Sequence, residues 1–377
     1  MKFNVSSKAL YSTASAVSKI INSKNALTIL NNFRLELRGD MLSIMAGDGE
    51  NFLEGRLQVS DASGEGTVCV DARRLTDLLK ELPDLGVSIT VEPELNYAMT
   101  LEYSNGKFNF MGFNGMEFPL PEELNEDAVR YTFSAESAKL IRGIDNTVFA
   151  VGNDELRPQM MGILWDVKPD SLIFVATDTR KLVKFTDSSV QPGCEGSFIL
   201  PLKSTVVFKN VFAKDQTVKV TLEEKGVKFE SENYVFNSRF LKGTFPDYNR
   251  VIPQANPYEL TVDRVSFQSS VRRIGAFCDA ANGLVRFSIR PESLEMKASE
   301  STFNASAWES VPCQFTGEGM VIGFSAPYIS EILGVINSEE VIVKLSDPSR
   351  PGVFVPAENK PDTELLMLLM PMLVTEF

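Results

Sequence analysis

The chain has 377 residues, of which 44% are hydrophobic, and its formal net charge is −13. This length predicts two or three domains with ordinary globular cores. Histidine is absent, which excludes Ser-His-Asp and Cys-His catalytic sites and disfavours transition-metal sites. Four cysteines without a Cys-x-x-Cys pair disfavour zinc and disulfide frameworks and favour a reducing cytoplasm. We expect no cofactor and no enzymatic activity.

A membrane-spanning helix is not expected. The longest apolar run, LLMLLMPML at residues 365–373, is about half the 18 to 20 residues that a span requires, and it contains a proline. The N-terminal segment has no continuous apolar core of the kind that a secretory signal needs. We therefore expect a cytoplasmic protein.

Taken in chain order, the predicted elements recur three times. A strand and helix begin in FNVSSKALY at Phe3, in YTFSAESAKLI at Tyr131 and in YELTVDRVSF at Tyr258, at spacings of 128 and 127 residues. Short strands follow in DMLSIMA, DSLIFVA and ESLEMKA. Second strand–helix pairs occur in VCVDARRLTDLLKEL, FILPLKSTVVFKNVF and VIGFSAPYISEILGVI. Each repeat then has a strand of period two, VSITVEP, VKVTLEE or VIVKLSD, that leads into a turn and a further strand.

This order predicts an α+β protein with three tandem domains at 1–125, 128–252 and 253–377, joined near residues 122–127 and 253–257. Each domain is expected to pack two helices on antiparallel sheets. Leu365–Met370 is predicted as the last strand of the third domain, because apolar residues on both faces suit a central strand.

Positive charge gathers in the predicted helices. The six helical segments together carry +6, although the whole chain carries −13. Within 201–214, Lys203, Lys209 and Lys214 occur without an acidic residue. If the helices share one side of an assembly, that side attracts nucleic acid through sequence-independent phosphate contacts. The alternative interpretation is that these lysines and arginines only cover solvated helix faces.

Four motifs in order carry a family resemblance: LTIL at Leu27–Leu30, ATDTRKL at Ala176–Leu182, GTFPDYNRVIP at Gly243–Pro253 and LMPM at Leu369–Met372. Together they resemble the bacterial β sliding clamp, the processivity subunit of DNA polymerase III, from Met1 to Met372. The resemblance implies three DNA-clamp domains per chain and a head-to-tail homodimeric ring. Such a ring encircles duplex DNA, slides without sequence specificity, and tethers the replicative polymerase and other replication and repair proteins. A separate ATP-driven clamp loader is expected to open it, because the chain has no P-loop.

The resemblance also implies residue roles. Lys24, Arg73, Arg157 and Lys203 match DNA-binding positions. Phe108 and Phe110 are expected to meet Phe277 of a second copy across the dimer interface. The chain departs from the family pattern after Arg157, where Pro158-Gln159 stands in place of a polar-aromatic pair.

A pocket on the second domain is expected to bind peptides that carry a glutamine and a few apolar residues. We call the positions that match it the docking residues. They are Met160, Thr177, Thr179, Arg180, Leu182, Pro246, Arg250, Val251, Leu368, Met370 and Met372. Flexible methionines would let one pocket accept several ligands. The usual Asp-Gly-His-Arg-Leu motif of the family reads Asp-Thr-Arg-Lys-Leu here, which alters the pocket.

Two other interpretations were considered. Asp178-Thr179 follows an apolar strand, as in aspartic proteases, but Arg180 replaces the glycine that their tight turn needs, and no second copy occurs. A monomeric repeat scaffold that binds protein peptides without encircling DNA is the main alternative. Such a scaffold would neither dimerise nor be retained on closed circular DNA.

Overall fold

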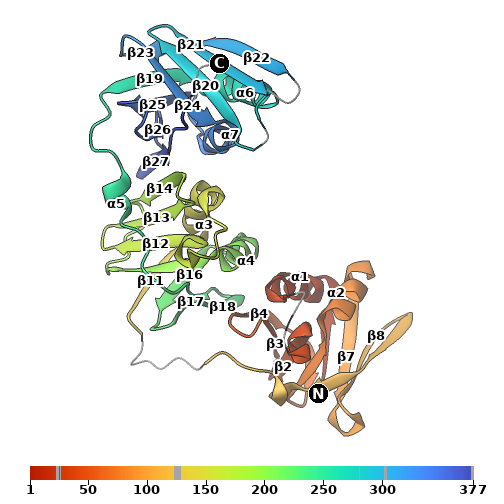
Figure 1. Cartoon of the computed structure of the whole chain (residues 1–377). Coiled ribbons are helices and arrows are strands. Elements are labelled where there is room, and N and C mark those ends of the chain that lie inside the picture. The colour runs from red at the N-terminus through yellow and green to blue at the C-terminus, as the bar shows by residue number, and fades with distance from the viewer. Residues whose placement is uncertain (23–24, 26, 123–128, 280, 301–303, 375–377) are drawn as a thin grey trace. The chain divides into compact units, whose positions relative to one another are not determined.

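The computed structural model describes residues 1–22, 25, 27–122, 129–279, 281–300 and 304–374 (Figure 1). Each repeat opens with a strand that leads directly into a helix. These pairs are β1 (Lys2–Ser6) with α1 (Ser7–Val17), β11 (Tyr131–Glu136) with α3 (Ser137–Thr147), and β19 (Tyr258–Asp263) with α6 (Arg264–Gly275). The second pairs are β6 (Gly66–Asp71) with α2 (Ala72–Glu81), β15 (Gly196–Pro201) with α4 (Leu202–Phe212), and β24 (Met320–Ser325) with α7 (Ala326–Val335). The predicted α+β class and threefold repeat are confirmed.

The remaining strands are short and pair with antiparallel neighbours. In the first repeat they are β2 (Asn32–Arg38), β3 (Met41–Gly47), β4 (Phe52–Gln58), β5 (Ser60–Ser63), β7 (Gly86–Glu92), β8 (Ala98–Tyr103), β9 (Gly106–Phe110) and β10 (Gly112–Asn114). In the second they are β12 (Gly162–Lys168), β13 (Ser171–Thr177), β14 (Lys181–Asp187), β16 (Thr217–Leu222), β17 (Gly226–Glu230) and β18 (Tyr234–Arg239). In the third they are β20 (Leu284–Arg290), β21 (Ser293–Glu300), β22 (Ala305–Pro312), β23 (Gln314–Phe315), β25 (Glu340–Leu345), β26 (Gly352–Pro356) and β27 (Thr363–Leu369). A one-turn helix, α5 (Tyr248–Val251), follows the second repeat.

Side-chain caps explain where several helices begin. The Ser6 hydroxyl accepts a hydrogen bond from the Ala9 N–H at the start of α1. Asp71 caps α2 and Asp263 caps α6, each through a hydrogen bond of 2.7 Å to a backbone N–H three residues later. Such caps satisfy N–H groups that the first helical turn leaves without a partner. Among the described residues, no helix is long and apolar enough to cross a membrane.

The described chain falls into two compact units, Met1–Ile141 with Lys203–Phe240, and Arg142–Leu202 with Leu241–Phe377. The first unit contains a five-stranded sheet, ordered β5-β1-β7-β8-β9, and a nine-stranded sheet, ordered β10-β6-β2-β3-β4-β18-β17-β16-β11. The second contains a nine-stranded sheet, β15-β12-β13-β14-β27-β26-β25-β19-β23, and a four-stranded sheet, β22-β21-β20-β24. Each unit therefore contains two complete sheets, and the strands of the second repeat are divided between the two units. The predicted domain boundaries stay a prediction.

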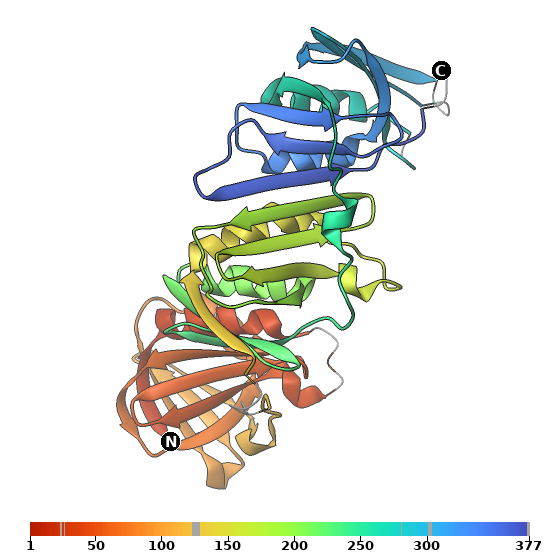
Figure 2. The ribbon, with the colours of Figure 1, turned by 90° about the vertical axis from the view of Figure 1, so that its left-hand side faces the viewer.

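The last strand lies at the centre of its sheet, as predicted. β27 pairs with β14 on one side and β26 on the other, so that Leu368 lies opposite Leu182 (Figure 2). Leu365 and Met367–Leu369 are buried, which accounts for the apolar sequence of the tail. The strand ends at Leu369, so the predicted last residue, Met370, lies just beyond it.

A polar cluster lies where β4 and β18 join in the first unit. The buried Asn51 side-chain oxygen is 2.9 Å from the Ser238 hydroxyl and accepts a hydrogen bond of 3.1 Å from the Arg239 N–H. The Ser204 hydroxyl is 2.8 Å from that of Ser238. Asn51 therefore provides the hydrogen-bond acceptor for buried donors on β18, a strand that is distant in sequence.

Replacing Asn51 with Ala is expected to lower the free energy of unfolding by about 2 kcal/mol, because buried donors lose their acceptor. Urea denaturation followed by circular dichroism would measure the change. Gln58→Ala, at the exposed end of β4, is the control and should change stability by less than about 0.5 kcal/mol. Equal effects of the two substitutions would contradict a stabilising role for Asn51.

Candidate docking and DNA-binding sites

The turn between β13 and β14 is fixed by its own side chains. The Thr177 hydroxyl donates to the Lys181 carbonyl at 2.8 Å, and the Asp178 carboxylate accepts from the N–H groups of Arg180 and Lys181 at 2.9 and 2.8 Å. Between them, Thr179 has a φ of 78°. Positive φ is strained for a β-branched residue and favours glycine. Thr179 therefore occupies a turn position to which glycine is better suited.

Lys181 anchors this turn to the third repeat. Its side chain is only 5% exposed, and its ammonium forms ion pairs with Glu331 of α7 and, at 3.6 Å, with Asp178. The ammonium also lies 4.4 Å from the centre of the Tyr328 ring. A buried charge is tolerated only where such partners replace water. This role of Lys181 could not be predicted from the sequence, because Glu331 is 150 residues away.

An apolar cluster lies beside the turn and contains two docking residues, Leu182 and Leu368, with Phe245 and Tyr248. The Tyr248 hydroxyl donates to Asp166 at 2.7 Å. Burial and the adjacent Asp166 carboxylate both raise the pKa of Tyr248, so the phenol stays protonated. Tyr248 thus connects α5 to β12, and it was missed because only its neighbours in GTFPDYNRVIP were singled out.

Several other docking residues are exposed around this cluster. The Met370 N–H donates to the Arg180 carbonyl at 2.8 Å, and Met370 is 39% exposed. Val251 is 46% exposed, and Arg250 forms an exposed ion pair of 3.0 Å with Asp247. On the other side, Gly152 packs against the carbonyls of Met160 and Thr177. Pro246, between Phe245 and Asp247, is half-buried.

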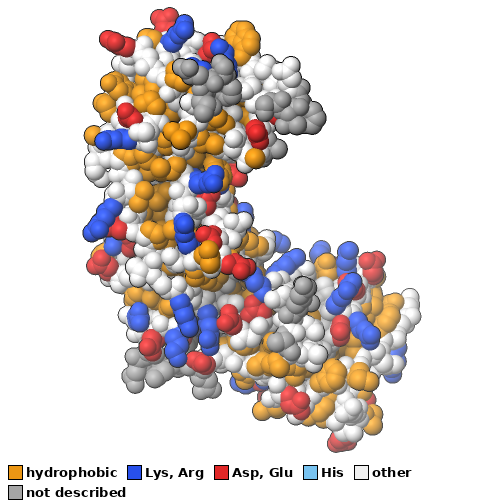
Figure 3. All heavy atoms as spheres, viewed as in Figure 1, with side chains coloured by type: hydrophobic (Ala, Val, Ile, Leu, Met, Phe, Trp, Pro, Cys, Tyr) orange, Lys and Arg blue, Asp and Glu red, His pale blue; other side chains and the backbone are white. Residues whose placement is uncertain are grey.

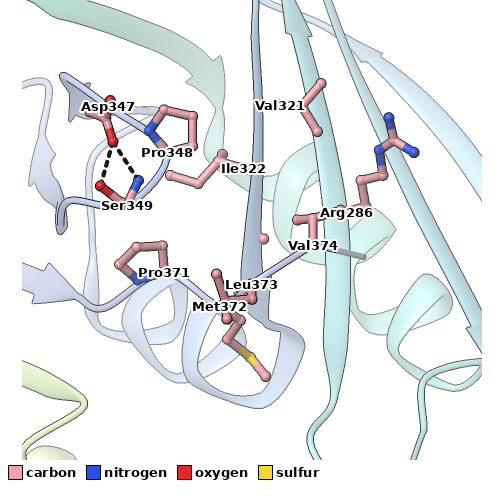
Figure 4. Close-up of a pocket in the computed structure, with 11 residues that line it drawn as sticks. Arg286, Val321, Ile322, Asp347, Pro348, Ser349, Pro371, Met372, Leu373 and Val374 are labelled. Atoms are coloured by element: carbon pink, nitrogen blue, oxygen red, sulfur yellow. Dashed lines mark hydrogen bonds between the residues drawn. The ribbon is translucent and has the colours of Figure 1, made fainter. Parts of the chain in front are cut away.

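Met372 occupies a different position. Its N–H donates to the Gly323 carbonyl of β24 at 2.8 Å. It lines a groove of about 620 Å³ in which Asp347 and Ser349 lie on one side and Val321 and Arg286 on the other (Figure 4). The C-terminal segment therefore leads from the apolar cluster into a groove on the third repeat.

The three predicted DNA-binding residues that the structure describes each have an acidic neighbour. Arg73, on α2, is 3.7 Å from Asp77, and its side chain is 91% exposed. Arg157 is 3.6 Å from Asp154. Basic and acidic side chains are interspersed on the face shown in Figure 3. Lys24 lies outside the described residues.

Lys203, on α4, has the closest acidic partner, because its ammonium is 2.6 Å from the Asp48 carboxylate. Burial acts to raise the pKa of Asp48. Hydrogen bonds from Lys203 and from two backbone N–H groups outweigh burial and hold this pKa below its usual value. Lys203 therefore stands on the expected helix, but an acid that the sequence did not indicate offsets its charge.

The residues predicted for the dimer interface lie near open sheet edges. Phe108 and Phe110 are on β9, an edge strand of the five-stranded sheet, and both are partly exposed. Phe277 follows α6 and is 41% exposed. Trp308 of β22, which was not among the predicted interface residues, is 66% exposed and lies on an edge of the four-stranded sheet. Its position between small and polar residues in ASAWES was the available signal.

Three copies of one strand–helix unit, merged into continuous antiparallel sheets, define a three-domain DNA clamp. Models for the N-terminal, central and C-terminal domains of the DNA polymerase III beta subunit match residues 1–122, 134–247 and 249–372. The beta sliding clamp of Pseudomonas aeruginosa is 27% identical over 370 residues, covering 97% of this chain and 99% of the relative. That of Bacillus subtilis is 25% identical over 382 residues, covering 98% and 99%.

Comparison with solved structures points to the same family. A sliding clamp from Pseudomonas aeruginosa superposes with a TM-score of 0.92 at 27% identity, covering 99% of this chain and 100% of the other. One from Bacillus subtilis gives 0.90 at 25% identity, covering all of both chains. The chain belongs to the DNA polymerase III beta subunit family, the beta sliding clamps. Its function is that of a DNA polymerase processivity factor, and the monomeric scaffold alternative is not favoured.

Replacing Thr179 with Gly is expected to raise the free energy of unfolding by about 1 kcal/mol, because glycine adopts positive φ without strain. Thermal unfolding followed by circular dichroism would measure the difference. Thr186→Gly, in the adjoining strand β14 at ordinary φ, should instead destabilise by about 1 kcal/mol. A loss of stability in both variants would show that Thr179 is not strained.

Proposed function

We propose that two copies of this chain close head to tail into a ring around duplex DNA. The observation that supports the proposal is that β9 in the first repeat and β22 in the third each form the edge of a sheet, with no strand paired on the outer side among the described residues. Edge strands present unpaired backbone groups, and a head-to-tail contact that closes produces a ring. The ring is cytoplasmic and keeps the polymerase on DNA without catalytic activity or a cofactor. A clamp loader opens it.

Light scattering tests the ring directly. A solution mass near twice 41.8 kDa is expected at micromolar concentration. Loaded rings should stay on closed circular DNA and leave it once the circle is cut, because retention is topological. A monomer at every accessible concentration would overturn the ring.

The DNA contacts are proposed to be nonspecific. Lys24, Arg73, Arg157 and Lys203 would meet phosphates, which fix no sequence and allow sliding. The acidic neighbours of the three described residues weaken each contact. The affinity for DNA should therefore be low. Because the contacts are to phosphates, this affinity should also fall as the salt concentration rises.

Asp48→Asn is expected to strengthen DNA binding, because it leaves the charge of Lys203 without its acidic partner. The slope of log affinity against log salt should steepen by about 1 per chain, as for one added phosphate contact. Fluorescence anisotropy with a labelled duplex over a salt series would measure it. Asp48→Asn combined with Lys203→Gln is the control and should remove the gain. An unchanged slope in the single variant would place Lys203 away from DNA.

The docking residues are proposed to bind polymerase and repair proteins through a short peptide with a glutamine and apolar side chains. The apolar cluster of Leu182 and Leu368, the exposed Met370 and the groove at Met372 support this proposal. Methionine side chains adapt to differently shaped ligands. A sliding clamp from Pseudomonas aeruginosa has been solved bound to griselimycin, which shows that a relative binds a ligand.

Arg250→Ala and Met372→Ala should each weaken peptide binding by about 1 to 2 kcal/mol, the usual range for contributing interface side chains. A fluorescent peptide with one glutamine followed by apolar residues would report affinity by anisotropy. Light scattering should find the dimer intact in both variants. Lys184→Ala, a partly exposed position on β14, is the matched control. Wild-type affinity in both test variants would refute the assigned pocket.

A further inference from the structure

The edge strand β22 has two different faces. Glu309 lies opposite the buried Met296 and accepts two hydrogen bonds of 2.7 Å from Arg273 of α6. This face, the core face, is therefore turned toward α6. Trp308 lies on the other face, the outer face, opposite Lys297. β22 thus directs a large aromatic side chain to the side away from the core.

The edge strand β9 is divided in the same way. Phe108 and Phe110 lie opposite Leu101 and Met99, both fully buried, so they belong to the core face. Lys107 and Asn109 alternate with them and occupy the outer face. Met111 follows directly and is 72% exposed. β9 therefore carries phenylalanines on its core face and polar side chains on its outer face, whereas β22 carries its aromatic side chain, Trp308, on the outer face.

When two strand edges pair, each face of one sheet continues into the same face of the other. The core-face contact predicted from the sequence, Phe108 and Phe110 with Phe277, therefore places the outer-face side chains of the two edges beside one another. Exposed single hydrophobic residues are common, but Trp308 stands on an open edge. Tryptophan is among the side chains most enriched where interfaces bury apolar area.

We infer that Trp308 forms the outer-face contact of the dimer interface, where it lies against the Lys107–Met111 segment of a second copy of this chain. The inference rests on the proposed ring and adds the residue that covers its outer side. The interface is then closed on both faces, by phenylalanines on the core face and by Trp308 on the outer face. The lysine stem and methionine of that segment supply apolar surface for the indole.

Tryptophan fluorescence gives a specific test because the chain has two tryptophans and Trp165 is fully buried. Quenching by acrylamide therefore reports on Trp308. The quenching constant of the wild-type dimer should be at least threefold smaller than that of a monomeric reference, Phe277→Asp. Light scattering establishes the state of each sample, and Trp308→Phe should lose the quenchable component.

Affinity gives an independent measurement. Trp308→Ala should raise the dimer dissociation constant at least tenfold, and Met111→Ser should raise it less. Leu156→Ala, at a residue 91% exposed, is the control and should leave it unchanged. A wild-type dimer in which Trp308 is quenched as in the monomer would overturn the inference but leave the ring standing. A wild-type chain that never dimerises would overturn both.

Discussion

The architecture depends on the need to pair backbone groups at the edges of sheets. A strand edge without a partner leaves N–H and C=O groups open to any other chain. In this protein each nine-stranded sheet combines strands from two consecutive repeats, through β4 with β18 and through β14 with β27. The compact units consequently follow the sheets and divide the second repeat. Repetition supplies the elements, but edge pairing determines which of them form a unit.

The candidate docking site results from one of these joints. Pairing of β27 with β14 places Leu368 opposite Leu182 and brings the Met370 N–H to the Arg180 carbonyl. The strained turn persists because the hydrogen bonds of Thr177 and Asp178 and the ion pairs of Lys181 determine its conformation from several directions. The proposed docking surface is thus built on a rigid frame, with flexible methionines at its border.

Much of the fold could be predicted from the sequence because its signals are local. A period-two strand that leads into a helical pattern is visible within about 20 residues, and three copies in one order exclude coincidence. The acidic partners of Lys181 and Lys203 could not be predicted from such local patterns. Asp48 and Lys203 are 155 residues apart, and only the sheet joint brings them together. Met372 was predicted beside the other docking residues, but its backbone contact with β24 places it in the groove, and no pattern in the chain indicated that contact.

The ion pairs also change how the charge distribution should be understood. A count of formal charges gives the helical segments +6. This count ignores ion pairs: Arg73 and Lys203 in these segments, and Arg157 outside them, each have a carboxylate within 4 Å. In the proposed DNA contacts a phosphate must compete with these carboxylates, so each contact contributes less than a free lysine or arginine would. For a sequence-specific binder such competition would be a loss. The proposed ring, which holds DNA by enclosure, does not need strong contacts, and weak contacts that exchange readily would let it move along the duplex.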